Sequence, residues 1–203
     1  MKKALIIFVR KPESGKVKTR LAATIGDEKA LAVYIQLLEH TNQISKSVFA
    51  DKFVFYFNEI EQNDIWSSEI FVKKLQREGD LGEKMGGAFS DLFDEGYGQV
   101  VIIGSDCPQL TTQIIEDAFD MLLQNDAVLG PADDGGYYLL GIKKLHAELF
   151  SEITWSTDKV LSQTIEVCDR AVLTYGLLPV LTDIDTEADL NSMQHFFSRN
   201  AAQ

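Results

Sequence analysis

A single carboxylate, Asp106, directly follows a strongly apolar segment of the chain. Residues 99–103, QVVII, have the composition of a buried strand, and Gly104 and Ser105 separate this strand from the acid. Ligands of open α/β sheets bind beside the carboxyl ends of the strands, so an acid at this position is a candidate metal ligand and catalytic group. The alternative is that Asp106 caps the next helix, which we expect to begin near residues 111–112.

A basic loop near the start of the chain is the second candidate. Residues 10–20, RKPESGKVKTR, carry five cations and lie between a predicted first strand and a helix. At such a junction, free backbone N–H groups and basic side chains favour phosphate. Neither GxxxxGK[ST] nor GxGxxG is present, because Gly15 stands alone. The alternative is a solvated surface loop with an incidental run of charge.

Two acidic segments follow further along the chain. In residues 130–138, GPADDGGYY, a tight turn would explain the Asp-Gly pair, while the adjacent acids and glycines also suit a ligand that approaches the backbone. In residues 182–190, TDIDTEADL, Thr186 and Asp189 predict a capping box at a helix start. Asp183 and Asp185 occupy alternate positions of an extended segment and should face the same side. Asp185 would pair with Asp106 around Mg²⁺ if the fold brings the two segments together.

Three other side chains with reactive or aromatic groups give weaker signals. Cys107 and Cys168 are too few for a disulfide framework and match no zinc spacing, so we expect reduced, structural thiols in a cytoplasmic protein. Trp155 suits the core and an acceptor pocket about equally well.

The overall composition predicts one soluble domain spanning residues 1–203. Of the 203 residues, 45% are hydrophobic and 25% charged, as in ordinary globular proteins. A net charge of −12 argues against broad affinity for nucleic acid or anionic membranes, and no apolar run is long enough to span a bilayer. The oligomeric state is not predicted.

Apolar runs and helical periodicity alternate along the chain, which favours an α/β fold with a mixed, mostly parallel sheet flanked by helices. The strand after the Gly-Gly pair is a candidate antiparallel member. Predicted strands cover residues 3–9, 52–57, 70–75, 99–103, 127–130, 137–142, 171–174 and 179–181. Predicted helices begin near residue 27 and cover residues 80–94, 114–123, 159–167 and 188–197.

Six ordered motifs resemble those of one enzyme family, and the resemblance covers about residues 3–190. They are FVRKPESGKVKTRL (8–21), GDLGEKM (79–85), VIIGSDCPQL (101–110), GPADDGGYYLLG (130–141), ITWST (153–157) and DIDTEADL (183–190). The chain resembles the glycosyltransferase-A-like nucleotide-diphospho-sugar transferases. Within them it is most similar to the bacterial branch related to 2-phospho-lactate guanylyltransferase, often called rSAM/selenodomain-associated transferase.

The resemblance implies a Rossmann-like sheet and a role for each motif. It implies that Asp106 and Asp185 hold Mg²⁺ or Mn²⁺ and that Lys18 and Asp106 are catalytic. Nucleotide-binding residues would be Arg10, Lys11, Gly15, Lys18, Arg20, Leu81, Gly82 and Ser105. Acceptor-binding residues would be Asp134, Gly135, Gly136, Trp155 and Thr157. The usual LAAGxGTR signature is replaced here by KPESGKVKTR, and Lys84 stands where Arg is commoner.

The implied function is a metal-dependent transferase that uses a nucleotide. We expect nucleotidyl transfer from an NTP to a small phosphorylated acceptor, because five loop cations exceed what a diphosphate requires. The alternatives are a glycosyltransferase that uses an NDP-sugar and a nucleotide-binding module without turnover. We expect neither nucleic acid nor membrane as a partner.

Overall fold

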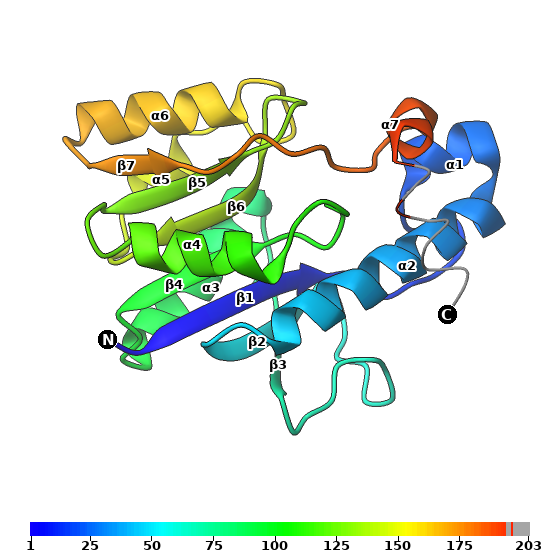
Figure 1. The fold of residues 1–203 in the computed structure, drawn as a ribbon, viewed down its shortest axis with the longest axis horizontal. Helices are drawn as coiled ribbons and strands as arrows, with labels where there is room; N and C mark the ends of the chain where they lie inside the picture. The colour runs from blue at the N-terminus through cyan, green and yellow to red at the C-terminus, as the bar shows by residue number, and fades with distance from the viewer. Residues whose placement is uncertain (194–195, 197–203) are drawn as a thin grey trace.

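A seven-stranded sheet lies between two layers of helices in the computed structural model, which describes residues 1–193 and 196 (Figure 1). The strands are β1 (Lys3–Val9), β2 (Asp51–Tyr56), β3 (Phe71–Leu75), β4 (Gln99–Ile103), β5 (Ala127–Pro131), β6 (Tyr137–Ile142) and β7 (Tyr175–Leu177). The helices are α1 (Thr19–Ile25), α2 (Asp27–Lys46), α3 (Leu81–Asp94), α4 (Thr112–Met121), α5 (Glu148–Ser151), α6 (Val160–Arg170) and α7 (Glu187–Ser192).

The strand order is β3-β2-β1-β4-β6-β5-β7, and the only antiparallel strand among these is β6. The predicted mixed sheet is therefore confirmed. Since β1 to β4 run parallel, their carboxyl ends meet at one edge of the sheet. The loops that follow these four strands begin at Arg10, Phe57, Gln76 and Gly104, and all four lie at this edge.

Alternating residues of the buried strands build one core on each face of the sheet. Leu5 and Ile7 of β1 belong to the core beneath α2 and α4, with Phe119 among its members. Ala4 and Ile6 point the other way, into the core beneath α3, α5 and α6. Strands covered on both faces are expected to be continuously apolar, as the first strand is.

A smaller apolar cluster attaches the end of the described chain to its beginning. Ile184 is fully buried with Leu21 of α1 and with Ala30 and Leu37 of α2. Figure 1 shows α7 lying beside α1, far from the β7 edge of the sheet. The segment that carries Asp185 is therefore held against the helix that follows the basic loop.

Differences from the predicted elements concentrate in the last third of the chain. The predicted strands at 171–174 and 179–181 are wrong, and a single strand, β7, lies between them. Val172 has a left-handed backbone with φ of 55°, which forms a turn there, and Leu181 makes only an isolated bridge to Ala132. The short helix α5 was not predicted, whereas α1 begins at Thr19, at the end of the basic loop, where a helix start was expected.

The closing helix begins as predicted, with Thr186 and Asp189 in a reciprocal capping box. It ends at Ser192, whereas the prediction extended to residue 197. Residues 194, 195 and 197 lie outside the described residues.

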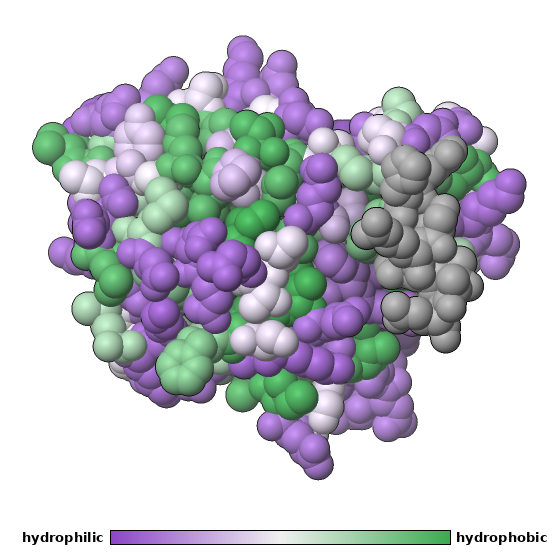
Figure 2. All heavy atoms as spheres, in the orientation of Figure 1, coloured by the Kyte–Doolittle hydropathy of each residue, from purple (hydrophilic) through white to green (hydrophobic). Residues whose placement is uncertain are grey.

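Hydrophilic and hydrophobic side chains alternate over much of the face in Figure 2, with hydrophobic colour gathered near β5 and β7 at the upper left. Leu177 and Val180 are among the exposed apolar residues of the chain. None of the helices in the described part combines the length and hydrophobicity of a membrane-spanning helix.

Gly82 should be indispensable for the packing of α3. A Cβ at this position would lie 2.2 Å from the Phe150 carbonyl oxygen and 2.3 Å from Trp155 Nε1. We expect Gly82→Ala to lower the free energy of unfolding by about 1–3 kcal/mol, the usual cost of overpacking, in urea denaturation. The matched control is Gly86→Ala one turn later, where the nearest atom is a Phe150 ring carbon at 3.2 Å. Equal stability of the two variants would contradict this account.

Candidate active site

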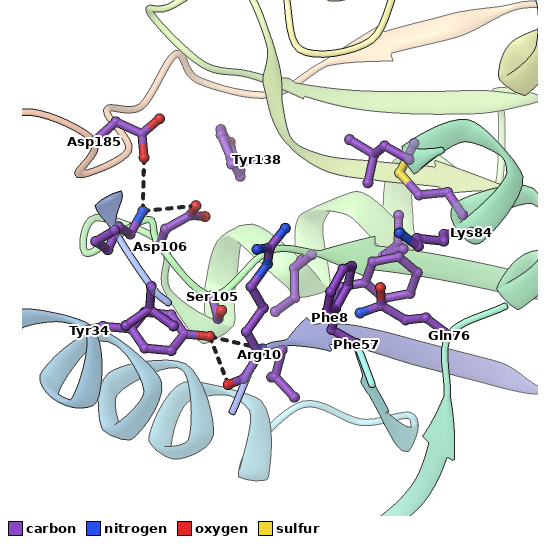
Figure 3. A pocket seen from close by; sticks show the side chains of 18 of the residues that line it. Phe8, Arg10, Tyr34, Phe57, Gln76, Lys84, Ser105, Asp106, Tyr138 and Asp185 are labelled. Carbon is purple, nitrogen blue, oxygen red and sulfur yellow. Dashed lines mark hydrogen bonds and ion pairs between the residues drawn. The ribbon is translucent and has the colours of Figure 1, made fainter. Parts of the chain in front are cut away.

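A cleft of about 640 Å³ opens at the edge where the parallel strands end. In Figure 3, Asp106 and Asp185 lie at one end of it and Lys84 and Gln76 at the other, with Arg10 between them. The position agrees with the general rule that ligands of α/β sheets bind beyond the carboxyl ends of strands. Because β6 is antiparallel, it contributes its amino end, and Tyr137 and Tyr138 line the opposite wall.

Lys18 is the centre of the acidic end. Its Nζ lies 3.1 Å from Asp106 Oδ2 and 3.0 Å from Asp185 Oδ1, the two ion pairs drawn to these carboxylates in Figure 3. The Lys18 side chain is 7% exposed. Burial alone would lower the pKa of Lys18, but the two carboxylates outweigh it and raise the pKa above its ordinary value. Lys18 therefore stays protonated.

A backbone hydrogen bond connects the two segments that carry the carboxylates. Asp106 does not cap the next helix: the N-cap of α4 is Thr111, whose Oγ1 accepts a hydrogen bond from Ile114 N. The Asp106 backbone oxygen instead accepts a hydrogen bond from Ile184 N at 3.0 Å. Asp185 N in turn donates to Asp189 Oδ2 at 3.1 Å. The predicted meeting of the Asp106 and Asp185 segments is thus present in the structure.

Neighbouring loops hold the same segment in place from the other side. Thr182 N donates to Gln109 Oε1 at 2.8 Å, and Thr182 Oγ1 donates to Asp133 Oδ2 at 2.7 Å. Sequence analysis did not assign a role to Gln109 or Thr182. Their contacts hold the backbone of the segment before Asp185 in place. No pattern of residue types in the sequence reveals such contacts.

Asp183 lies behind the carboxylate pair and has an unusual environment. In the described residues its Oδ1 is buried without a hydrogen-bond partner. Burial, followed by the negative charge of Asp106, raises the pKa of Asp183 to about 8. The same surroundings disfavour the thiolate form of the neighbouring Cys107. Burial and the charge of Asp183 raise the pKa of Cys107 far above its ordinary value. Cys107 is therefore a buried thiol, as predicted.

The predicted basic loop divides into two groups. Lys16, Lys18 and Arg20 line the cleft, and Arg20 lies 3.4 Å from Asp185. Lys11 points elsewhere and pairs with Glu59 at 2.9 Å and Glu61 at 2.7 Å. Its predicted contact with nucleotide finds no support in this geometry.

Several other predicted nucleotide-binding residues reach the cleft. Ser105, Leu81 and Arg10 all line it. The Arg10 backbone is fixed by Tyr34, whose hydroxyl accepts from Arg10 N at 3.0 Å and donates to Arg10 O at 3.1 Å. Gly15 and Gly82 are not among the lining residues: Gly15 provides a turn with φ of 76°, and Gly82 packs against Trp155.

A cationic and aromatic group forms the other end of the cleft, and two of its members, Phe57 and Gln76, were missed by the sequence analysis. The Arg10 guanidinium and the Lys84 ammonium each lie 4.4 Å from the centroid of the Phe57 ring. Gln76 lies nearby and donates from Nε2 to Phe55 O at 3.0 Å. Phe57 and Gln76 directly follow β2 and β3, so the strand-end signal that identified Asp106 was present for them too.

The five predicted acceptor residues lie around the cleft and are not among the residues that line it. Asp134 Oδ1 accepts from Gly136 N at 2.8 Å, which closes the turn before β6. Gly135 O accepts from Leu161 N at 2.9 Å, so this turn packs on the start of α6. These contacts fit the alternative of a structural turn, and the acceptor role stays a prediction.

Trp155 and Thr157 lie on the adjoining loop. Trp155 Nε1 donates to Phe150 O at 3.2 Å, and its ring meets the edge of Tyr137, a lining residue. Thr157 Oγ1 donates to Thr154 O at 2.7 Å. Ser156, between them, is the residue of this loop that lines the cleft.

A divalent cation fits the chemistry of the carboxylate pair. Hard ions such as Mg²⁺ accept one or two protein carboxylates when substrate phosphates complete the shell. Asp106 and Asp185 already converge on one cationic atom, Lys18 Nζ. Within the described residues, no group of three or more His, Cys, Asp or Glu is arranged to hold a metal ion by itself. The pair would therefore require a phosphate as partner.

Comparison with known proteins identifies the family. Residues 40–157 match the family described as "Uncharacterized protein conserved in bacteria (DUF2064)". The chain belongs to this family. None of the curated proteins matches the sequence.

A candidate nucleotide-diphospho-sugar transferase from Desulfovibrio desulfuricans G20 has a similar crystal structure, with a TM-score of 0.89 and 33% identity. The match covers 100% of this chain and 96% of that one. This relationship places the DUF2064 protein among transferases with the nucleotide-diphospho-sugar transferase fold, as predicted.

More distant structures share the fold alone. The 4-diphosphocytidyl-2C-methyl-D-erythritol synthase from Anaerococcus prevotii DSM 20548 has a TM-score of 0.64 at 15% identity, covering 97% of this chain and 96% of that one. CMP:2-keto-3-deoxy-manno-octonic acid synthetase complexed with CTP has a TM-score of 0.62 at 10% identity, covering 98% and 100%.

The raised pKa of Asp183 predicts a pH-dependent stability in EDTA. The folded protein keeps the Asp183 proton between about pH 4 and pH 8, whereas the unfolded chain has released it. The free energy of unfolding contributed by this group therefore falls as the pH rises through that window, by up to about 1.4 kcal/mol per pH unit. Asp183→Asn removes this pH-dependent contribution. The stability of the variant relative to wild type should therefore increase from pH 5 to pH 7.5. Urea denaturation at both values measures the difference, and a constant difference would contradict the assignment.

Proposed function

We propose that the protein is a metal-dependent nucleotidyltransferase that moves an NMP group from an NTP to a small phosphorylated acceptor. The observation that carries the proposal is the charge of the cleft. Among the described residues, five cations line it, against two carboxylates that are already engaged by Lys18. This excess of positive charge favours a polyanion such as a triphosphate.

The two ends of the cleft suit the two ends of a nucleotide. Phosphates belong at the Lys18 end, where Lys16 and Arg20 supply further donors. The base belongs at the Phe57 end, where an aromatic ring and Gln76 offer stacking and amide hydrogen bonds. The span between them passes Ser105 and Arg10 at the middle of the cleft.

In the proposed reaction, an acceptor oxygen attacks the α-phosphorus, the bond to the bridging oxygen breaks and pyrophosphate leaves. Mg²⁺ or Mn²⁺ held by Asp106 and Asp185 would neutralise charge on the transferred phosphate. Lys18 and Arg20 would hold the oxygens on which charge develops. Tyr137, Tyr138 and Ser156, opposite the carboxylates, would face the acceptor.

The second candidate is a glycosyltransferase that uses an NDP-sugar. The observation in its favour is the name of the Desulfovibrio relative, a candidate nucleotide-diphospho-sugar transferase. The same carboxylates and the same metal would then bind a diphosphate.

Calorimetry separates the two donors. With Mg²⁺ present, we expect at least one of GTP, CTP, UTP and ATP to bind more tightly than its matching NDP-glucose or NDP-mannose. Pyrophosphate should appear from that NTP when a suitable phosphorylated acceptor is supplied. Tighter binding of a sugar nucleotide, together with its hydrolysis to NDP and free sugar, would favour the glycosyltransferase. Binding without any turnover would favour a binding module.

Substitutions in the basic loop test the phosphate site. Lys18→Ala and Arg20→Ala should each weaken NTP binding by about 1.5–3 kcal/mol, the range for hydrogen bonds to charged groups. Lys11→Ala removes the same charge from the same loop but from a side chain paired with Glu59 and Glu61, so its effect should stay below about 0.5 kcal/mol. Lys16→Ala should also matter less, because Lys16 is exposed and pairs with Glu13. Equal losses in all four variants would indicate a diffuse patch of charge.

A further inference from the structure

The ammonium group of Lys18 occupies the point on which the two acidic side chains converge. Its distances of 3.1 Å to Asp106 and 3.0 Å to Asp185 are those of direct ion pairs, and the side chain is almost fully buried. Lys18 is also one of three non-glycine residues in the described chain with positive φ, at 46°. A left-handed backbone at a residue with a side chain is disfavoured and persists where the surroundings enforce it.

A divalent ion bonded to both of these carboxylate oxygens would compete with the ammonium group for the position between them. Mg²⁺ would lie about 2.0–2.1 Å from its oxygen ligands. Bound to Asp106 Oδ2 and Asp185 Oδ1, it would lie beside Lys18 Nζ as a like charge in a poorly hydrated place. Metal entry therefore requires Lys18 to leave, and Lys18 needs another anion before it can leave without remaining buried and unpaired.

The triphosphate supplies that anion. We propose that Lys18 is an exchangeable counter-ion, which keeps the divalent metal out of the Asp106–Asp185 site until a nucleotide arrives. This inference rests on the proposed function and adds to it the order in which nucleotide and metal bind. The incoming phosphates draw Lys18 away from the carboxylates, and the vacated position and a phosphate oxygen together complete the metal site.

The exchange makes metal and nucleotide binding reciprocal. Each ligand raises the affinity for the other by the same factor, because both stabilise the arrangement in which Lys18 has moved. The free protein should bind Mn²⁺ weakly, and removal of the Lys18 charge should unmask the site. A lysine that only binds phosphate would have no effect on metal affinity in the absence of nucleotide.

The test uses Mn²⁺ alone, followed by the electron paramagnetic resonance signal of the free ion and by thermal melting. We expect Lys18→Met to bind Mn²⁺ at least tenfold more tightly than wild type without nucleotide and to show a larger rise of Tm with Mn²⁺. Lys16→Met is the matched control, since it removes one loop cation that does not touch Asp106 or Asp185. Its Mn²⁺ affinity should stay within about twofold of wild type.

A second variant, Lys18→Gln, keeps a donor beside the carboxylates and carries the test if Lys18→Met does not fold. Mn²⁺ affinity in the Lys18 variants no higher than in wild type, or an equal gain in Lys16→Met, would overturn the proposal. The Mn²⁺ titration contains no nucleotide, so it is independent of whether the donor is an NTP. Failure of pyrophosphate release with an intact gain of metal affinity would overturn the proposed reaction alone.

Discussion

The site depends on one electrostatic arrangement: a buried ammonium group held between two carboxylates from distant parts of the chain. Lys18 follows β1, Asp106 follows β4, and Asp185 lies on the returning segment before α7. A cation that is 7% exposed is tolerated only with such partners. Any change that separates the three segments leaves a buried charge uncompensated, so the geometry of the cleft and the stability of this edge are linked.

The fold brings these segments together by ordinary means. Parallel strands align their carboxyl ends, which places Arg10, Phe57, Gln76 and Asp106 along one edge. The returning segment is attached by backbone and core, through the Ile184 N–Asp106 O bond and the burial of the Ile184 side chain. The polar residues of the cleft are thus positioned by apolar packing behind them. Under the proposed function, the charges of the cleft would bind the phosphates of the nucleotide.

Much of this architecture was predictable from local patterns in the sequence. Buried strands, the antiparallel β6, the α3 boundaries and the Thr186–Asp189 capping box all follow from composition and spacing over a few residues. The orientation of Lys11 was not predictable, because it depends on Glu59 and Glu61, which lie nearly fifty residues away. The Phe57 group was missed for a similar reason: its meaning comes from Arg10 and Lys84 on other elements. Edge strands near β7 were misplaced because short exposed strands carry a weak hydrophobic signal.

The central claim is that one site, formed by Lys18, Asp106 and Asp185, receives both the metal and the phosphates. A crystal structure with Mn²⁺ and a non-hydrolysable NTP analogue tests it most directly through the anomalous signal of manganese. The account predicts a single manganese ion bonded to a carboxylate oxygen of Asp106 and of Asp185, with Lys18 Nζ moved onto a phosphate oxygen. A manganese ion bound elsewhere, or Lys18 still bridging the two carboxylates with nucleotide and metal bound, would contradict it.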